Sequence, residues 1–196
     1  MKKEINYSER NTMIEDKERW NIRHVEKPMP HYVAPILEKY TELANVGTAL
    51  DVACGIGRNT HYLADLGFTV DAIDLSDYAL GQIREDEKII KHEVDLDFYD
   101  LEKQKYDLII NINYLNRRLM AQMTDALNAK GTVIFETFIV AHDKPEKGSM
   151  NPDYLLNPNE LLNAFKDLNI IYYEEKDVIN LRGEEARLAS LVAKKF

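Results

Sequence analysis

The sequence has a single cysteine, Cys54, among 196 residues, so no disulfide bond can form within the chain. It also has no apolar run near the roughly 20 residues that a transmembrane helix needs. Its first residues include lysines but no apolar segment of the secretory type. These absences predict a protein of the cytoplasm, with no membrane partner.

Basic residues are too few and too scattered to bind a polyanion. The sequence holds 25 Lys and Arg against 34 Asp and Glu, and its formal net charge is −9. The densest basic pairs, residues 117–118 and 194–195, belong to no basic stripe. Because nucleic-acid affinity comes largely from cations that neutralise phosphates, we expect a small-molecule partner and no nucleic acid.

Metal ligands and an obvious nucleophile are also missing. The five histidines show no His-x-x-x-His spacing, and no second cysteine is present, so no metal site is predicted. Cys54 ends a short apolar run, where a cysteine usually behaves as a small hydrophobic residue. The chemistry must therefore come from other residues.

From Thr48 onward, strand-like apolar segments alternate with helix-like ones. Strands are predicted at residues 49–54, 68–73, 89–94, 106–112, 132–138, 170–174 and 186–194. Helices are predicted at residues 58–66, 77–84 and 115–127, with a last one opened by residues 158–160. Repeated β-α-β units require a mostly parallel sheet with helices on both faces. The pattern predicts a doubly wound α/β fold with a seven-stranded sheet.

Two segments depart from this alternation. Residues 1–45 are helical in pattern, and we interpret them as an N-terminal cap of a single domain that spans residues 1–196. In this cap, Trp20 with Arg23 and His24 either closes over a substrate or staples the helix in place. Residues 139–157 are irregular and rich in Pro, Gly, Asn and Asp. A loop of that length is usually functional or disordered, and we expect it to shape the pocket for the small-molecule partner.

The segment most typical of a binding site is residues 49–60, which combine a strand, a glycine-rich turn and a helix start. Gly55 and Gly57 let the backbone approach a ligand without an intervening Cβ atom. In an open α/β sheet, ligands bind beyond the carboxyl ends of the strands, where this turn lies. The segment therefore predicts a ligand site at that edge of the sheet.

Acidic residues stand at the ends of the next two strands. Asp74 closes the second strand, where a carboxylate can accept hydrogen bonds from both hydroxyls of a ribose. Asp95 ends the third strand, where it can accept a hydrogen bond from an adenine amino group. The glycine-rich turn and the two acids together suit an adenosine-containing ligand.

The residues around the turn favour one such ligand over another. A dinucleotide requires Gly-x-Gly-x-x-Gly, but Thr60 occupies the third glycine position. Asp51 stands beside the turn, where a carboxylate repels a pyrophosphate and attracts an ammonium group. S-adenosylmethionine carries an ammonium and a sulfonium but no phosphate. The charges favour it, and a nicotinamide-dependent oxidoreductase is the alternative.

Residues 51–59 (Asp-Val-Ala-Cys-Gly-Ile-Gly-Arg-Asn) resemble motif I of the class I S-adenosylmethionine-dependent methyltransferases, with alanine in place of the first glycine. The Arg-Asn pair and the ordered segments 114–119, 135–138 and 151–161 resemble the small bacterial tellurite-resistance (TehB-type) methyltransferases. The resemblance covers most of the chain after the N-terminal cap. It implies a Rossmann-like methyltransferase fold.

The resemblance also implies which residues bind S-adenosylmethionine. In motif I, Asp51, Gly55 and Gly57 hold its methionine part, and the other cofactor-binding residues of the motif are Ala53, Arg58 and Asn59. Those at the next strand ends take its adenosine: Asp74 the ribose, Leu75 one face of the adenine, and Asp95 with Leu96 the adenine edge. Asn111, at the end of the fourth strand, begins the segment that faces the methyl group.

The predicted function is methyl transfer from S-adenosylmethionine to an unidentified small molecule, by in-line displacement. A sulfonium is already an activated leaving group, so the protein mainly has to align the reactants and exclude water. A thiolate or a selenium or tellurium oxyanion needs little general base, whereas an oxygen or nitrogen acceptor can need one. Tyr114 and Glu136 are the candidate catalytic residues. A protein that binds S-adenosylmethionine without turnover is the second alternative.

Overall fold

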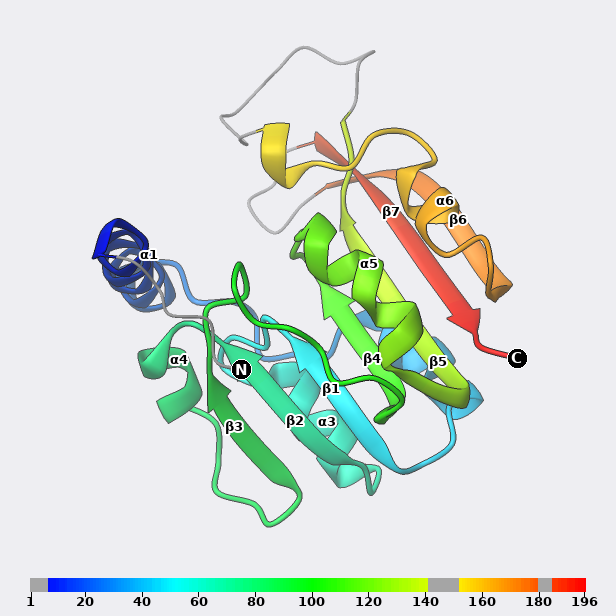
Figure 1. The fold of residues 1–196 in the computed structure, drawn as a ribbon, viewed down its shortest axis with the longest axis horizontal. Helices are drawn as coiled ribbons and strands as arrows, with labels where there is room; N and C mark the ends of the chain where they lie inside the picture. The colour runs from blue at the N-terminus through cyan, green and yellow to red at the C-terminus, as the bar shows by residue number, and fades with distance from the viewer. Residues whose placement is uncertain (1–6, 141–151, 180–184) are drawn as a thin grey trace.

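One mixed β-sheet organises the protein, in a computed structural model that describes residues 7–140, 152–179 and 185–196. In these residues seven strands follow the order β3-β2-β1-β4-β5-β7-β6 (Figure 1). The parallel strands are β1 (Thr48–Val52), β2 (Thr69–Asp74), β3 (Ile89–Glu93), β4 (Tyr106–Ile112) and β5 (Leu127–Phe138). Strand β7 (Glu185–Lys194) runs antiparallel to β5 and to β6 (Asn169–Ile179). The predicted α/β fold is confirmed.

Helices cover both faces of this sheet. One face packs against α2 (Pro35–Tyr40), η1 (Thr41–Leu43), α3 (Arg58–Asp65) and α4 (Asp77–Gly81). The other packs against α5 (Arg117–Ala126) and α6 (Glu160–Ala164), and η2 (Pro152–Tyr154) precedes α6. None of the helices in the described segments is long and apolar enough to cross a membrane.

The central strands are apolar on both faces because both faces are covered. In β4, Leu108 and Ile110 join one core cluster while Ile109 joins the other, and all three are fully buried. Successive side chains of a strand point to opposite faces, so a strand between two helix layers needs apolar residues at nearly every position. This explains the continuous apolar runs seen in the sequence.

Several helix ends follow the expected capping chemistry. The Ser76 hydroxyl accepts a hydrogen bond from the Ala79 amide (3.1 Å) and so caps α4. Gly67 has a φ of +101° directly after the last turn of α3, a conformation that favours glycine and ends the helix. These local interactions fix the directions in which the chain leaves the sheet edge.

Other predicted boundaries were wrong. The helix predicted at residues 115–127 begins only at Arg117, because the Asn116 side chain caps it by accepting from the Leu119 amide (3.0 Å). Its predicted last residue, Leu127, instead opens β5, which therefore starts earlier than residue 132. Pro158 lies before the Asn159 cap of α6 and not in its first turn. Strand β6 continues to Ile179, well past the predicted residue 174.

Helix α1 (Tyr7–Glu26) lies beyond the carboxyl ends of the parallel strands, beside α4 (Figure 1). The Lys17 ammonium pairs with the carboxylates of Asp77 (2.8 Å) and Glu93 (2.6 Å). The Asn21 amide donates a hydrogen bond to Asp77 (2.8 Å). These polar contacts hold the helix over the sheet edge where the sequence predicts a ligand.

The predicted loop at residues 139–157 is described only at its ends, and residues 141–151 lie outside the described residues. Ile139 forms a parallel bridge with Leu156, and the Val140 amide donates to the Leu156 carbonyl (2.9 Å). The two ends of the loop therefore meet beside the end of β5.

Phe135 tests how much the core contributes to stability. Its ring is fully buried on β5, 6.0 Å from the Phe165 ring. Phe135→Ala should lower the free energy of unfolding by about 3–5 kcal/mol, because it leaves a cavity in the core between the sheet and helices α5 and α6. Urea denaturation measures this. The control is Phe98→Ala, at a ring that is 41% exposed, and equal losses in the two variants would contradict the core described above.

Candidate functional site

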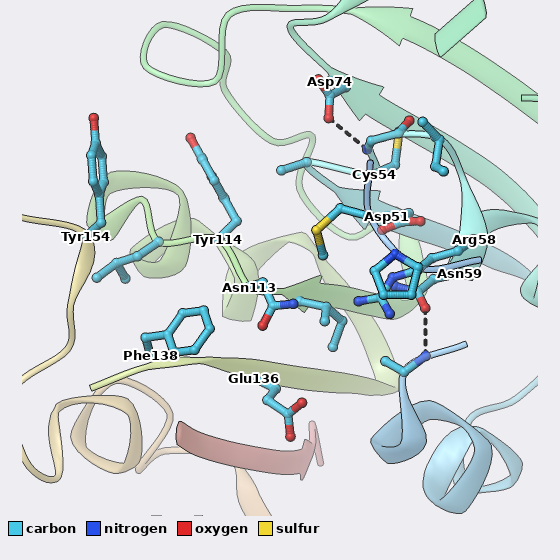
Figure 2. A pocket seen from close by; sticks show the side chains of 18 of the residues that line it. Asp51, Cys54, Arg58, Asn59, Asp74, Asn113, Tyr114, Glu136, Phe138 and Tyr154 are labelled. Carbon is cyan, nitrogen blue, oxygen red and sulfur yellow. Dashed lines mark hydrogen bonds between the residues drawn. The ribbon is translucent and has the colours of Figure 1, made fainter. Parts of the chain in front are cut away.

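A cavity of about 1360 Å³ opens at the carboxyl ends of the parallel strands (Figure 2). Its wall includes residues from α1, the β1–α3 turn, the ends of the strands and the far edge formed by β6 and β7. The predicted site residues that line it are Asp51, Ala53, Gly55, Arg58, Asn59, Asp74, Leu75, Asp95, Leu96, Tyr114 and Glu136. Gly57 and Asn111 do not line it. The fold thus gathers residues from five strand ends into one hollow.

The turn after β1 has an unusual backbone. Ala53, Gly55 and Gly57 all have positive φ values, of +54°, +54° and +79°. Ala53 holds the position of the first glycine of the motif, and this conformation costs an L-residue roughly 1–2 kcal/mol. A Cβ atom on Gly57 would lie 2.7 Å from Cγ1 of Ile83. Gly57 therefore shapes the turn against the residues after α4 and does not contact the cavity.

Asp74, at the end of β2, joins two turns. Its Oδ2 accepts a hydrogen bond from the Gly55 amide (2.8 Å), and its Oδ1 accepts one from the Ser76 amide (2.8 Å). Figure 2 shows the first of these beside the cavity. Each carboxylate oxygen has two lone pairs, so both oxygens can accept a further hydrogen bond from a ligand.

Asp51 is almost completely buried, with 2% of its surface exposed. Its Oδ2 accepts a hydrogen bond from the Thr60 hydroxyl (2.7 Å). Burial raises the pKa of Asp51 to about 7, although the Thr60 hydrogen bond and the Arg58 charge lower it. Thr60, which breaks the dinucleotide fingerprint, therefore serves as the partner of this acid.

The residues after the motif glycines anchor the N-terminal segment. The Asn59 side-chain oxygen accepts a hydrogen bond from the Ala34 amide (3.1 Å), and Asn59 is buried. The Arg58 guanidinium donates to the Tyr32 carbonyl (3.1 Å). Burial lowers the pKa of Arg58, and the nearby Asp51 carboxyl opposes that shift. Both residues thus line the cavity and also fix the position of Tyr32 and Ala34, which form part of its wall.

At the end of β3, Asp95 and Leu96 are held by a separate set of contacts. Asp95 Oδ1 accepts a hydrogen bond from the Asp97 amide (2.9 Å), and burial raises the pKa of Asp95. The Leu96 carbonyl accepts from the Arg118 guanidinium (3.0 Å) and the Asn116 amide (3.2 Å). The start of α5 therefore holds this segment at the rim of the cavity.

Asn111 supports the loop that follows β4. It is 1% exposed, and its amide nitrogen donates to the Tyr114 carbonyl (2.6 Å). Asn113, between them, has a φ of +60° and lines the cavity. Burial raises the pKa of Tyr114 well above its usual value of 10, so its hydroxyl stays protonated at neutral pH.

Glu136 projects into the cavity from the end of β5 (Figure 2). Its Oε2 accepts a hydrogen bond from the Ser190 hydroxyl of β7 (2.7 Å). Its Oε1 accepts no hydrogen bond from the described residues. One carboxylate oxygen is therefore available to a ligand.

Residues of α1 close the cavity from above. Trp20, Arg23 and His24 all line it, and the Arg23 guanidinium lies 5.1 Å from the Trp20 ring centre. The His24 Cε1 atom is 3.2 Å from the place where a Cβ atom of Gly55 would be. Burial lowers the pKa of His24, so its ring is neutral at pH 7. These three side chains therefore lie over the site, which is the position that the role of closing over a substrate requires.

The far wall was missed by sequence reasoning. It includes Tyr172 and Lys176 of β6 and Leu188 of β7. These residues lie in no motif, and only the antiparallel return of β7 between β5 and β6 brings them to the cavity. The alternation of apolar residues predicts such strands but not which of them border a site.

No reactive thiolate or metal cluster is seen in the described part of the chain. Cys54 lines the cavity, but burial raises the pKa of its thiol well above the usual value of 9.0, so it stays protonated. No three His, Cys, Asp or Glu side chains of the described residues are grouped as metal ligands. The arrangement suits binding and alignment of two reactants.

Comparison with known proteins identifies the family. Residues 33–188 match the family of the tellurite resistance protein TehB. The chain belongs to this family. No curated protein sequence matches the chain. The resemblance to class I S-adenosylmethionine-dependent methyltransferases of the TehB type is confirmed.

Solved structures agree with this family. The fold is similar to that of TehB from Haemophilus influenzae, with a TM-score of 0.72 and 19% identity over 92% of this chain and 67% of that one. It is also similar to a SAM-dependent methyltransferase from Methanosarcina mazei (TM-score 0.64, 16% identity, 84% of this chain and 99% of that one). A third match is the phosphoethanolamine N-methyltransferase 2 of Haemonchus contortus in complex with S-adenosyl-L-methionine (TM-score 0.66, 14% identity, 90% of this chain and 60% of that one).

Gly57 provides a test of the turn. Gly57→Ala should destabilise the TehB-family protein by about 2–4 kcal/mol, because the methyl group meets Ile83 at a positive φ. Gly81→Ala is the matched control, since nothing lies within 4 Å of its added Cβ atom. Thermal or urea unfolding of both variants measures the difference. Two equally stable variants would show that the turn does not have the described backbone.

The buried Asp51 predicts a pH dependence of stability. Its folded pKa of about 7 exceeds the ordinary 3.8, so the folded state holds the proton more tightly. The free energy of unfolding should therefore fall as pH rises from about 4 to about 7, by an amount on the order of 2–4 kcal/mol. Asp51→Asn should lack this fall, whereas the exposed control Asp125→Asn should keep it. Urea titrations at several pH values measure the free energy of unfolding of each variant. If it depends on pH in the same way in Asp51→Asn and in the original chain, the assignment is wrong.

Proposed function

We propose that this TehB-family protein transfers a methyl group from S-adenosylmethionine to a small-molecule acceptor within the cavity described above. The observation that carries the proposal is that the carboxylates of Asp51 and Asp74 flank a single turn, whose Gly55 amide is held by Asp74 (2.8 Å). An acid on each side of a glycine turn suits a ligand with an ammonium at one end and a ribose at the other.

The residues fit that cofactor along the edge of the sheet. Asp51 is assigned to the ammonium, and the Gly55 turn, with Ala53, Arg58 and Asn59, to the methionine part. Gly55 lines the cavity, and its missing side chain lets the His24 ring approach the turn closely. Gly57 contributes by permitting the turn, and Asn111 by holding the Tyr114 loop.

The adenosine part is assigned to the ends of β2 and β3. Asp74 has lone pairs left for both ribose hydroxyls, since each oxygen accepts one backbone amide. Leu75 is assigned to one face of the adenine, and Asp95 with Leu96 to its edge, since all three line the cavity. The neutral His24 covers the turn from α1.

Asp51 also explains why a cationic ligand is preferred. A buried acid with a pKa of about 7 is only partly ionised at neutral pH. An ammonium group placed beside it favours the carboxylate form, so the ligand completes an ion pair that the free protein lacks. A pyrophosphate would instead meet an acid and be repelled, which disfavours a nicotinamide cofactor.

The bound sulfonium supplies a methyl group on an activated leaving group. The protein has to hold the acceptor in line with that group and exclude water. Tyr114 stays protonated, so it is assigned to positioning through its hydroxyl and not to proton removal. Glu136, with one oxygen unengaged by the described residues, is the group that can accept a proton from an acceptor.

Two further parts of the proposal concern partners and location. A net charge of −9 disfavours nucleic acid as a partner. A single buried cysteine fits a reducing compartment, and we place the protein in the cytoplasm. The single domain of residues 1–196 with its N-terminal cap is retained, because α1 and the segment at residue 34 both contribute to the cavity wall.

Calorimetry with the purified chain tests the function. It should bind S-adenosylmethionine and S-adenosylhomocysteine but not NADH. Asp74→Asn should weaken binding about 10- to 100-fold, because the ribose loses a charged acceptor. Asp125→Asn, at an exposed acid, should bind normally. Tight NADH binding, or no effect of the Asp74 change in a folded variant, would overturn the site. Production of S-adenosylhomocysteine with an acceptor separates an enzyme from a non-catalytic binding protein.

A further inference from the structure

The half of the cavity away from the proposed cofactor residues lies at the ends of β4 and β5. Ile112 is the register partner of Glu136 on these neighbouring strands, and the Asn113 amide donates to the Glu136 carbonyl (2.7 Å). Glu136 is therefore one strand further from the β1 turn than Asn111. An acceptor in line with a methyl group would lie in this half, beside the Glu136 carboxylate.

The Glu136 carboxylate is placed to receive a hydrogen-bond donor. Only one of its oxygens is engaged by the described residues, through the Ser190 hydroxyl at 2.7 Å. Ser190 is 1% exposed, so its hydroxyl is a fixed partner that orients the carboxylate. Because Glu136 lines the cavity, its remaining oxygen is available to accept an N–H or O–H from a bound molecule (Figure 2).

Aromatic side chains line the same cavity as this acid. Phe138, Tyr114 and Tyr154 come from the ends of β4 and β5 and from the segment before α6 (Figure 2). Tyr40 and Tyr172 also line the cavity, and their rings pack 5.0 Å apart. Aromatic faces near a carboxylate attract an ammonium group, and they also offer apolar surface to an organic body.

The cations of the same wall already have partners. Lys39 lies over the rings of Tyr40 (4.9 Å) and Tyr172 (5.4 Å), and Lys176 pairs with Glu174 (3.0 Å). Arg58 donates to a backbone carbonyl and is attracted by both Asp51 and Glu136. An inorganic oxyanion would be repelled by the negative charge of Glu136 and would leave the aromatic surface of the cavity without a contact.

The cavity is also larger than one ligand requires. Its volume of about 1360 Å³ exceeds the roughly 300–1,000 Å³ typical of small-molecule sites. We infer that the acceptor is an organic amine with an aromatic or aliphatic body, whose nitrogen is held and deprotonated by Glu136. This inference rests on the proposed methyl transfer and specifies its substrate class.

The reaction balances with these groups alone. The amine binds as an ammonium, and the Glu136 carboxylate takes one proton from it, which leaves a lone pair on nitrogen. The nitrogen then forms a bond to the methyl carbon as the sulfur–carbon bond breaks, and sulfur keeps that electron pair as a neutral thioether. The product is a methylammonium, and Glu136 returns its proton to water when the product leaves.

Turnover assays on the full chain test the inference. S-adenosylmethionine is combined with methylamine, benzylamine or phenethylamine, with benzyl alcohol, and with sodium selenite or tellurite, and S-adenosylhomocysteine and methylated products are measured by mass spectrometry. We expect N-methylated product from the aryl amines, with a KM lower than that for methylamine. Glu136→Gln should lower kcat/KM about 100- to 1,000-fold. Glu85→Gln, the same change at an exposed side chain, should have no effect.

Two further measurements separate a chemical role from a structural one. Ser190→Ala removes the hydrogen bond that orients the Glu136 carboxylate, so it should lower kcat for the amine and leave the KM for S-adenosylmethionine unchanged. Glu136→Gln should bind S-adenosylmethionine within twofold of the original chain. If that cofactor binds but no amine is methylated, or selenite, tellurite or the alcohol reacts faster, the amine assignment is overturned. If the cofactor itself does not bind, the proposed function fails instead.

Discussion

The two hydrogen bonds of the Asp74 carboxylate hold the site together. One oxygen accepts the Gly55 amide and the other accepts the Ser76 amide, so one side chain joins the turn after β1 to the turn after β2. Hydrogen bonds to a charged group are worth about 1.5–3 kcal/mol each, which is enough to hold a turn with three positive φ values. The geometry of the cavity floor depends on this acid.

Helix α1, which covers the cavity, is held differently from the strand ends that form the cavity floor. The floor rests on strands whose apolar side chains are buried on both faces, whereas α1 is attached through Lys17 and Asn21 to Asp77 and Glu93. Partly exposed ion pairs contribute about 0.2–1 kcal/mol each. The protein thus joins a well-packed sheet edge to a helix that is held mainly by polar contacts.

Local chemistry made much of this predictable. Caps such as Ser76, the stop at Gly67 and the acids at strand ends depend on a few neighbouring residues, so a single sequence reveals them. The predictions failed where distant parts of the chain decide. Leu127 leaves the helix because it pairs with Tyr106 of β4, and after a register shift the pairing continues from Thr132. This long-range pairing overrides the helical pattern before it.

The sequence by itself determined the fold class, the glycine turn and the order of acids along the sheet edge, because period, turn chemistry and β-α-β handedness act over short stretches of chain. Only the tertiary structure decided that Gly57 packs against Ile83, that Glu136 meets Ser190, and that β6 and α1 complete the cavity. Those contacts join residues far apart in the chain, and their partners are set by how the strands and helices pack.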